Sequence, residues 1–205
     1  MGKIKLTKGE LKRQRDALRQ YERYLPTLQL KKQQLQMEIL RQLSLKDQAD
    51  KHREKKLKSI FVWAGLLAEP QVNIKELFAF EKTVTSIHNI AGVDIPVFEK
   101  AEFKETEYDL FTTPLWVDNA IEALKELISL QAEINIIDKG INILKHELRV
   151  TTQRVNLFEK VKIPESEEAI RLIKIYLGDQ MTNAVGRSKM AKRKIENLIL
   201  SEVAA

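Results

Sequence analysis

The chain has 205 residues, of which 31% are charged and only 6% aromatic, with 7 Gly and 5 Pro. Charge this dense with so few turn-forming residues indicates long, solvent-exposed helices and argues against a β-sandwich or barrel. The absence of cysteine excludes disulfide scaffolds, thiolate zinc sites and cysteine nucleophiles. The longest apolar stretch, residues 59–68, is about half as long as a membrane span. Because no signal-peptide pattern opens the sequence either, we expect a soluble intracellular protein.

The formal net charge of +6 is unevenly distributed along the chain. Residues 1–58 carry a net charge of +10, residues 59–118 carry −6 and residues 119–205 carry +2. The basic excess of the last segment is concentrated in Arg187, Lys189, Lys192, Arg193 and Lys194. We therefore expect the two chain ends and the middle to meet different partners.

A long helix is expected from Leu6 to Leu67. Alternating steps of three and four residues connect nine positions from Leu11 to Ile39, and seven of them are apolar. The stretch from Ser44 to Lys56 is nearly all polar, and the apolar pattern returns at Leu57. Pro26 removes a backbone hydrogen bond and predicts a kink near Tyr24. The expected coiled-coil core residues of this helix are Leu18, Leu25, Leu28 and Leu35.

A second heptad pattern begins after Thr113 and Pro114, which are typical of a helix N-cap and first turn. Twelve of its thirteen positions from Trp116 to Phe158 are apolar, and only Thr151 departs. Such a long regular pattern predicts a left-handed supercoil. Pro164 is expected to interrupt this helix. The expected core residues are Leu127, Leu130, Ile134, Ile137, Ile141, Leu144 and Leu148.

The middle of the chain carries the turn signals. Asn73 and Glu76 resemble a capping box for a short helix over residues 74–81. Residues 83–103 are rich in Val, Ile and Phe, and Ala91-Gly92 lies between two β-prone runs, which predicts a β-hairpin. Pro96 restricts its run to an edge strand.

These patterns predict a mainly α fold: a long antiparallel two-helix coiled coil formed by the N- and C-terminal segments, with a small β-hairpin and a short helix at its tip. The expected divisions are an N-terminal coiled-coil helix over residues 1–68, a tip region over residues 69–113 and a C-terminal coiled-coil helix over residues 114–205, bent near residue 164.

No motif for catalysis, cofactor binding or metal binding stands out in the sequence. His52, His88 and His146 are isolated, without the i, i+4 pair of a helical zinc site. No phosphate-binding glycine loop of the G-x-x-x-x-G-K-[ST] or G-x-G-x-x-G type occurs. We therefore expect a non-catalytic protein without a cofactor or small-molecule substrate.

Three stretches resemble the D subunit of the V-type and A-type rotary ATPases. Residues 25–35 resemble the leucine- and lysine-rich opening helix of that family, and residues 90–98 are similar to its Ala-Gly-Val-x-x-Pro-Val strand. Residues 154–164 resemble its Arg-Val-Asn-x-Leu-Glu-x-x-x-Ile-Pro signature. The chain departs from the family at Gln33-Gln34, where an Arg-Asp pair is expected, and at Phe158, which stands one place from the expected Leu.

The resemblance implies a central rotor shaft of an ATP-driven, ion-translocating complex on the cytoplasmic face of a membrane. It implies that both chain ends sit inside the catalytic hexamer of the A and B subunits. It also implies that the acidic middle contacts the F subunit and a socket subunit on the membrane ring. The direction of ATP chemistry and the coupling ion do not follow from it.

Two surface hypotheses follow. In the first, Arg187, Lys189, Lys192, Arg193 and Lys194 face acidic loops of the hexamer; the alternative is a solvated tail. In the second, the hairpin around Val93, Ile95 and Val97 and the flanking Phe80, Phe98 and Phe103 form a docking surface for the F subunit or the socket; the alternative is packing on the chain's own helices.

Two other classes stay open. A net charge of +10 on residues 1–58 would allow a basic coiled coil to contact nucleic acid. No nucleic-acid-binding motif accompanies this charge, however, and we do not expect nucleic acid as a partner. A helical-hairpin chaperone or adaptor would need free apolar surface at its tip.

Overall fold

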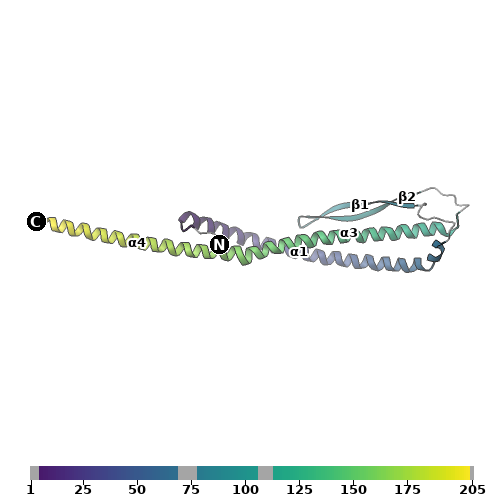
Figure 1. Cartoon of the computed structure of the whole chain (residues 1–205), viewed down its shortest axis with the longest axis horizontal. Coiled ribbons are helices and arrows are strands. Elements are labelled where there is room, and N and C mark those ends of the chain that lie inside the picture. The colour runs from purple at the N-terminus through teal and green to yellow at the C-terminus, as the bar shows by residue number, and fades with distance from the viewer. Residues whose placement is uncertain (1–4, 69–77, 106–112, 204–205) are drawn as a thin grey trace. The chain divides into compact units, whose positions relative to one another are not determined.

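A computed structural model describes residues 5–68, 78–105 and 113–203 of the chain. The elements, in chain order, are α1 (Lys8–Phe61), the 3₁₀ turn η1 (Ala64–Ala68), β1 (Phe78–Ile90), β2 (Val93–Glu105), α3 (Trp116–Leu157), the π turn η2 (Phe158–Lys162) and α4 (Ile163–Val203) (Figure 1). The expected fold class, mainly α with long N- and C-terminal helices and a small β-hairpin, is confirmed.

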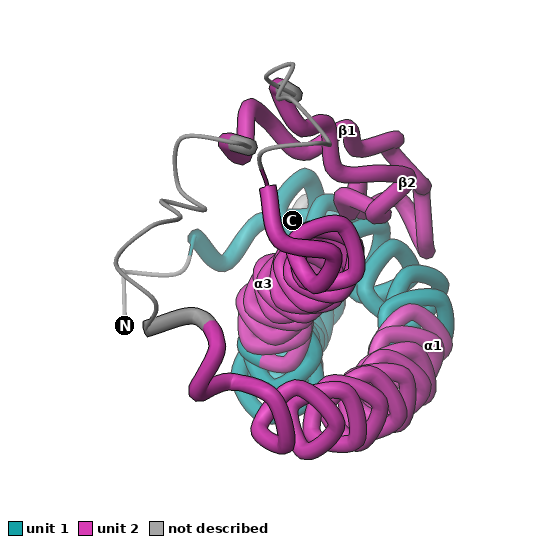
Figure 2. Tube along the Cα trace, turned by 90° about the vertical axis from the view of Figure 1, so that its right-hand side faces the viewer, with its two compact units in different colours: residues 1–29, 153–205 teal, residues 30–152 magenta. Residues whose placement is uncertain are grey.

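The chain divides into two compact units, one formed by residues 1–29 and 153–205 and the other by residues 30–152 (Figure 2). The second unit contains the end of α1, most of α3 and the hairpin. Its helices run antiparallel, because Lys31 of α1 contacts Glu147 of α3 whereas Lys56 contacts Glu126. The hairpin lies along α3 (Figures 1 and 2).

The core of the 30–152 unit joins all three segments at one level. Leu35 and Ile39 of α1, Val93 and Ile95 of β2 and Leu144 of α3 form one buried cluster. A second cluster forms where α3 begins, with Val117 and Ile121 buried against Phe103, Trp116, Leu124 and Ile128. Burial of these side chains is the main favourable term that holds the hairpin against the helices.

None of the expected core positions is exposed. Leu35, Ile134, Ile141 and Leu144 are buried. The other seven are partly buried: Leu18, Leu25, Leu28, Leu127, Leu130, Ile137 and Leu148. Thr151, the polar position in the heptad pattern of α3, is buried as well. The spacing read from the sequence thus selects the helix faces that the structure covers.

In the unit of residues 1–29 and 153–205, the first part of α1 lies beside the end of α3 and the start of α4. The rings of Tyr21 and Phe158 are 5.1 Å apart between centroids. Val155, Ala169, Ile170 and Ile173 are buried in this unit. The Thr7 hydroxyl accepts a hydrogen bond from the Glu10 backbone N–H at 3.3 Å and so caps α1.

The two helix prolines are accommodated differently. α1 continues through Pro26. Near Pro164 the helix changes its hydrogen-bond pattern: residues 158–162 form a π turn, and the Ile163 N–H donates to the Phe158 carbonyl. Pro164 has no N–H to donate and its ring crowds the preceding turn, which the wider π turn relieves. The expected interruption therefore takes the form of a π turn within a helical path from Trp116 to Val203.

The hairpin is longer than expected, and the prediction of a short helix is wrong for its last residues, 78–81. Each strand has 13 residues, and Phe78 pairs with Glu105 at the open end. Residues 78–81 therefore belong to β1 and not to a helix. Phe78, Ala79 and Phe80 pair with β2, and the Phe80 and Phe103 rings meet edge to face with their centroids 6.0 Å apart. Asn73, Glu76 and the rest of the expected helix lie outside the described residues. α3 begins at Trp116, two residues after Pro114.

The hairpin turn places Ala91 at φ 52° and Gly92 at φ 75°. Positive φ at both central residues matches the right-handed twist of the flanking strands, as in a type I′ turn. The Asn89 side-chain oxygen accepts a hydrogen bond from the Gly92 N–H at 3.1 Å and supports this turn. Within the described ranges, no helix is long and apolar enough to cross a membrane.

Replacement of Leu144 by Ala should destabilise the protein by about 2–5 kcal/mol, because a completely buried side chain at the meeting point of three segments is lost. Thermal unfolding followed by circular dichroism measures the effect. Ile143→Ala is the matched control: its side chain is 39% exposed, so its melting temperature should stay close to that of the unaltered chain. Equal losses in the two variants would contradict the packing described.

Replacement of Ala91 by Asn should stabilise the hairpin, because Asn tolerates positive φ whereas Ala is strained there by about 1 kcal/mol. Ala91→Val, with a branched side chain at the same position, should weaken it. Hydrogen exchange of the strand amides measures both. Slower exchange in the Val variant than in the Asn variant would overturn the expectation.

Candidate interaction surfaces

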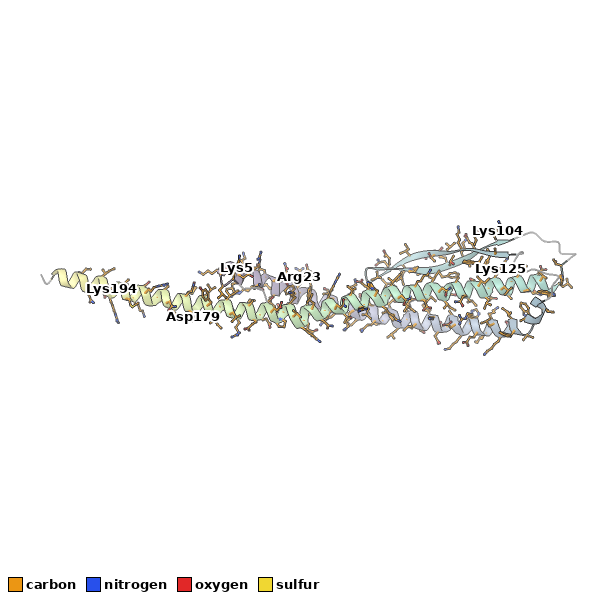
Figure 3. The ribbon with its side chains drawn as sticks, viewed as in Figure 1. Lys5, Arg23, Lys104, Lys125, Asp179 and Lys194 are labelled. Atoms are coloured by element: carbon orange, nitrogen blue, oxygen red, sulfur yellow. The ribbon has the colours of Figure 1, made fainter. Side chains whose placement is uncertain are left out.

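The basic cluster Arg187, Lys189, Lys192, Arg193 and Lys194 lies on the C-terminal part of α4, and all five side chains are exposed. Lys192 approaches Glu196 of the same helix at 3.7 Å. Figure 3 shows Lys194 extending from the helix into solvent. Every residue from 178 to 197 is exposed, so this stretch of α4 has no covering segment among the described residues.

Apolar side chains are interleaved with the basic cluster. They lie off the heptad pattern that resumes after Pro164 and runs in three- and four-residue steps from Ile170 through Ile173, Leu177, Gln180 and Ala184. Met181, Val185, Met190, Ile195 and Ile199 are each more than half exposed. Four of them share one face of the helix. Steps of four and three residues connect Met181, Val185, Ser188, Lys192, Ile195 and Ile199. This stripe is out of phase with the heptad pattern followed from Ile170. A helix with exposed basic and apolar residues is suited to contact with a partner.

The hairpin residues expected to dock a partner are divided between core and surface. Val93 and Ile95 are buried against α1 and α3, so they present no surface. Phe103 packs against the cluster of Val117 and Ile121. Val93, Ile95 and Phe103 are therefore not part of a docking surface, because their side chains pack on the chain's own helices.

The other three of the six residues lie outside these two clusters. Phe80 is 46% exposed and Val97 is 40% exposed, whereas Phe98 is partly buried. Val97 and Phe98 line an open groove of about 350 Å³ between β2 and the two helices. The other walls of this groove include Gln42, His52, Leu130 and Ile137. The candidate docking surface on the hairpin is thus Phe80 together with the groove edge at Val97.

Charge on the exposed face of the hairpin is organised around Glu102. Its carboxylate lies 2.9 Å from the Lys100 ammonium and 3.2 Å from that of Lys82. Hydrogen bonds from Lys100 and Lys82 hold the pKa of the Glu102 carboxyl below its ordinary value. Because this site is exposed, the ion pairs contribute little to stability.

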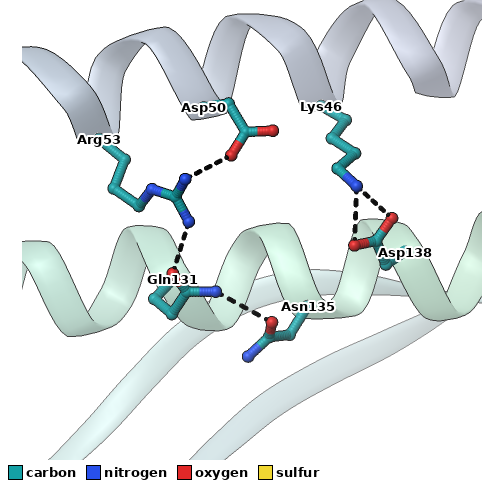
Figure 4. A network of polar contacts seen from close by, with 6 residues as sticks. All are labelled: Lys46, Asp50, Arg53, Gln131, Asn135 and Asp138. Atoms are coloured by element: carbon teal, nitrogen blue, oxygen red, sulfur yellow. Dashed lines mark hydrogen bonds and ion pairs between the residues drawn. The ribbon is translucent and has the colours of Figure 1, made fainter.

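A third polar feature lies between α1 and α3 (Figure 4). The Lys46 ammonium donates to both carboxylate oxygens of Asp138, at 2.7 and 2.9 Å. The Arg53 guanidinium donates to the Gln131 side-chain oxygen at 2.7 Å and pairs with Asp50 at 3.0 Å. The Gln131 amide donates in turn to Asn135 at 3.0 Å. These contacts replace apolar packing over the polar stretch of α1.

The three histidines, His52, His88 and His146, are exposed and lie on different elements. Within the part of the chain that the structure describes, no three His, Cys, Asp or Glu side chains gather in a geometry that would hold a metal ion.

Antiparallel long helices, a β-hairpin packed along one of them and an uncovered basic helix end define a helical-hairpin protein with surfaces for partner chains. The family model described as the ATP synthase D subunit matches residues 10–193. The V-type ATP synthase D subunit of Borreliella burgdorferi is 46% identical over 195 residues, which cover 95% of this chain and 96% of that protein.

The protein of the same name from Chlamydia pneumoniae is 36% identical over 197 residues, which cover 94% of this chain and 93% of that protein. The corresponding protein of Chlamydia caviae is 35% identical, with 94% of each chain covered. The chain belongs to the ATP synthase D-subunit family, and the resemblance found in the sequence is confirmed.

Proposed function

We propose that this chain is the central rotor shaft of a V/A-type rotary ATPase and transmits torque between the catalytic A/B hexamer and the membrane ion-translocating ring. In this proposal the chain itself catalyses no reaction. The observation that carries the proposal is the uncovered end of α4, where basic and apolar side chains alternate without any covering segment among the described residues. Membership of the D-subunit family supports it.

The helices have the properties that a torque-bearing element needs. α1 has 54 residues, which corresponds to a helix of about 80 Å. The helical path from Trp116 to Val203 contains no loop, since a π turn joins α3 to α4. In the 30–152 unit, packing at Leu144 and ion pairs to α1 connect the two helices, so that torsion of one is resisted by the other.

The end of α4 is assigned to the inside of the hexamer. Acidic loops there would attract the basic cluster, and exposed charged contacts are individually weak. Weak contacts suit a shaft that has to move between successive positions. The hairpin, with Phe80 and the groove edge at Val97, is assigned to the F subunit or the socket subunit. The complex would hold the chain at the cytoplasmic face of the membrane.

An affinity purification of the tagged chain from native membranes, washed in moderate salt, tests the assignment. The A and B subunits should copurify together with a small stalk subunit. Recovery of nucleic acid or of unrelated client proteins, without ATPase subunits, would overturn the rotor assignment and favour a basic coiled-coil or chaperone function.

Reversal of three charges in the basic cluster, Arg187→Glu with Lys189→Glu and Arg193→Glu, should lower coupled ATP-driven ion transport several-fold, because attraction to acidic loops becomes repulsion. The assembled complex is assayed for ATP hydrolysis and ion pumping together. The matched control, Lys55→Glu with Lys58→Glu and Lys145→Glu, reverses three exposed charges elsewhere and should pump normally. Equal pumping in both variants would contradict the role of the cluster.

Replacement of Val97 by Asp should abolish copurification of the small stalk subunit, because it places a charge at the edge of the candidate groove. Ile87→Asp places the same charge on an exposed position of β1 and should leave binding intact. Val93 is unsuitable for this test, since its burial means that Asp there would disrupt the hairpin itself. Normal binding by the Val97 variant would exclude this surface.

A further inference from the structure

The polar stretch of α1 keeps the heptad phase of the apolar seam. Between the buried Ile39 and Ile60, steps of three and four residues fall on Gln42, Lys46, Ala49, Arg53 and Lys56. These five side chains are buried or partly buried, whereas the neighbouring Lys51 and Lys55 are exposed. The basic residues at these positions therefore face α3, where apolar residues would be expected in a coiled coil.

Each of these inward-facing cations has a polar partner on α3. Besides the contacts of Lys46 with Asp138 and of Arg53 with Gln131, the Lys56 ammonium lies 2.6 Å from the Glu126 carboxylate. The same arrangement recurs further along the pair, where Lys31 lies 2.8 Å from Glu147. In each of the ion pairs of Lys31, Lys46 and Lys56, α1 supplies the cation and α3 the carboxylate.

The arrangement is poorly suited to stability alone. The Arg53 Nε is buried and has no hydrogen-bond partner among the described residues. Partly buried ion pairs lose much of their attraction to desolvation, and apolar residues of similar size often stabilise such positions better. A groove lined by Ala49, Leu130 and Ile137 also opens at this level, so apolar packing there is incomplete.

We propose that Lys46, Arg53 and Lys56 of α1, matched with Asp138, Gln131 and Glu126 of α3, specify the partner and the register of the helix pair. A seam of apolar residues repeating every seven positions does not distinguish one heptad register from the next. It also does not distinguish this helix pair from a pair formed with a second copy of the chain. This inference does not depend on the rotor function.

The alternatives are disfavoured by charge. Two copies of α1 paired through this stretch would bring its cations together, and two copies of α3 paired likewise would bring carboxylates together. A slip of one heptad in one direction would set Lys46 against Lys145 and Lys31 against Arg154. Arg53 would then meet Asp138, and Lys56 would meet Glu133. A slip in the other direction would set Arg53 against Leu124 and leave Lys46 beside Gln131. The like-charge contacts of Lys31 and Lys46 therefore disfavour the first slip, and the loss of the carboxylate partners of Lys46 and Lys56 disfavours the second.

Charge reversal in the full-length chain tests the proposal. Spin labels on cysteines introduced at the exposed positions Lys55 and Glu122 report the register by pulsed electron resonance, since a slip of one heptad moves a label by about 10 Å. The native sequence has no cysteine to interfere. Sedimentation velocity reports self-association on the same samples.

The variant K46E/K56E should lose the single label distance of the unaltered chain or form dimers. Addition of E126K/D138K, which exchanges the charges between the helices, should restore the single distance and the original sedimentation. The control K58E/K139E makes the same net charge change at exposed positions and should behave like the unaltered chain. A native distance and native sedimentation in K46E/K56E would overturn the proposal.

Replacement of both ion pairs by apolar residues gives an independent test that does not depend on repulsion. The variant K46L/K56L/E126L/D138L should melt at an equal or higher temperature and yet populate more than one label distance or self-associate. One native distance with unchanged sedimentation in this variant would also overturn the proposal, since register would then be specified without the charges.

Discussion

The apolar seam of α3 is the constraint on which the arrangement of residues 30–152 depends. Eleven of the twelve heptad positions within α3 are apolar, and a helix with such a face is stable only when another segment covers it. α1 and β2 provide that cover together, since Leu144 lies in one buried cluster with Leu35 and Ile39 of α1 and with Val93 and Ile95 of β2. The hairpin is consequently a structural part of the helix pair at its turn end. Only Phe80 and the groove edge at Val97 are left, among the six hairpin residues considered for docking, to meet other chains.

Apolar and ionic contacts have different physical roles along the helix pair. Burial of the cluster that contains Leu35 and Leu144 supplies stability. The free energy of this burial would change little if the partner side chain came from a second copy of the chain or from the next heptad. The ion pairs beyond it add little net stability but are directional, since each requires a carboxylate at one place. Long helices with repetitive seams need the second kind of contact more than compact domains do, because they have many registers of similar apolar burial. For a torque-transmitting element, a single register would also keep torsion from being lost in slippage.

Much of the fold could be predicted from local patterns. The three- and four-residue steps identified helix faces that are covered, and Ala91-Gly92 identified the hairpin turn because it lies between two β-prone runs. The structure shows positive φ at both of these residues. The helix expected at residues 78–81 was wrong, since Asn73 and Glu76 suggested a cap whereas pairing with residues 103–105 decided the conformation. The burial of Val93 and Ile95 could not be read locally, because α1 and α3 cover them. The ionic positions at Lys46 and Arg53 were missed because the heptad pattern was not followed through the polar stretch from Ser44 to Lys56.

The exposed end of α4 has few interactions within the described part of the chain that would stabilise it as a helix. Helices without tertiary contacts are only marginally stable in water, and every residue from 178 to 197 is exposed. Gly178 and Gly186, where an added Cβ would meet nothing within 4 Å, lower the helix propensity further without any packing benefit. A surface that covered Met181, Val185 and their neighbours would supply the remaining stability, and ordering of this segment would then be coupled to binding. In the proposed rotor, the hexamer would supply that surface, and the mixture of charge with small apolar contacts would hold the helix end straight without fixing it to one orientation.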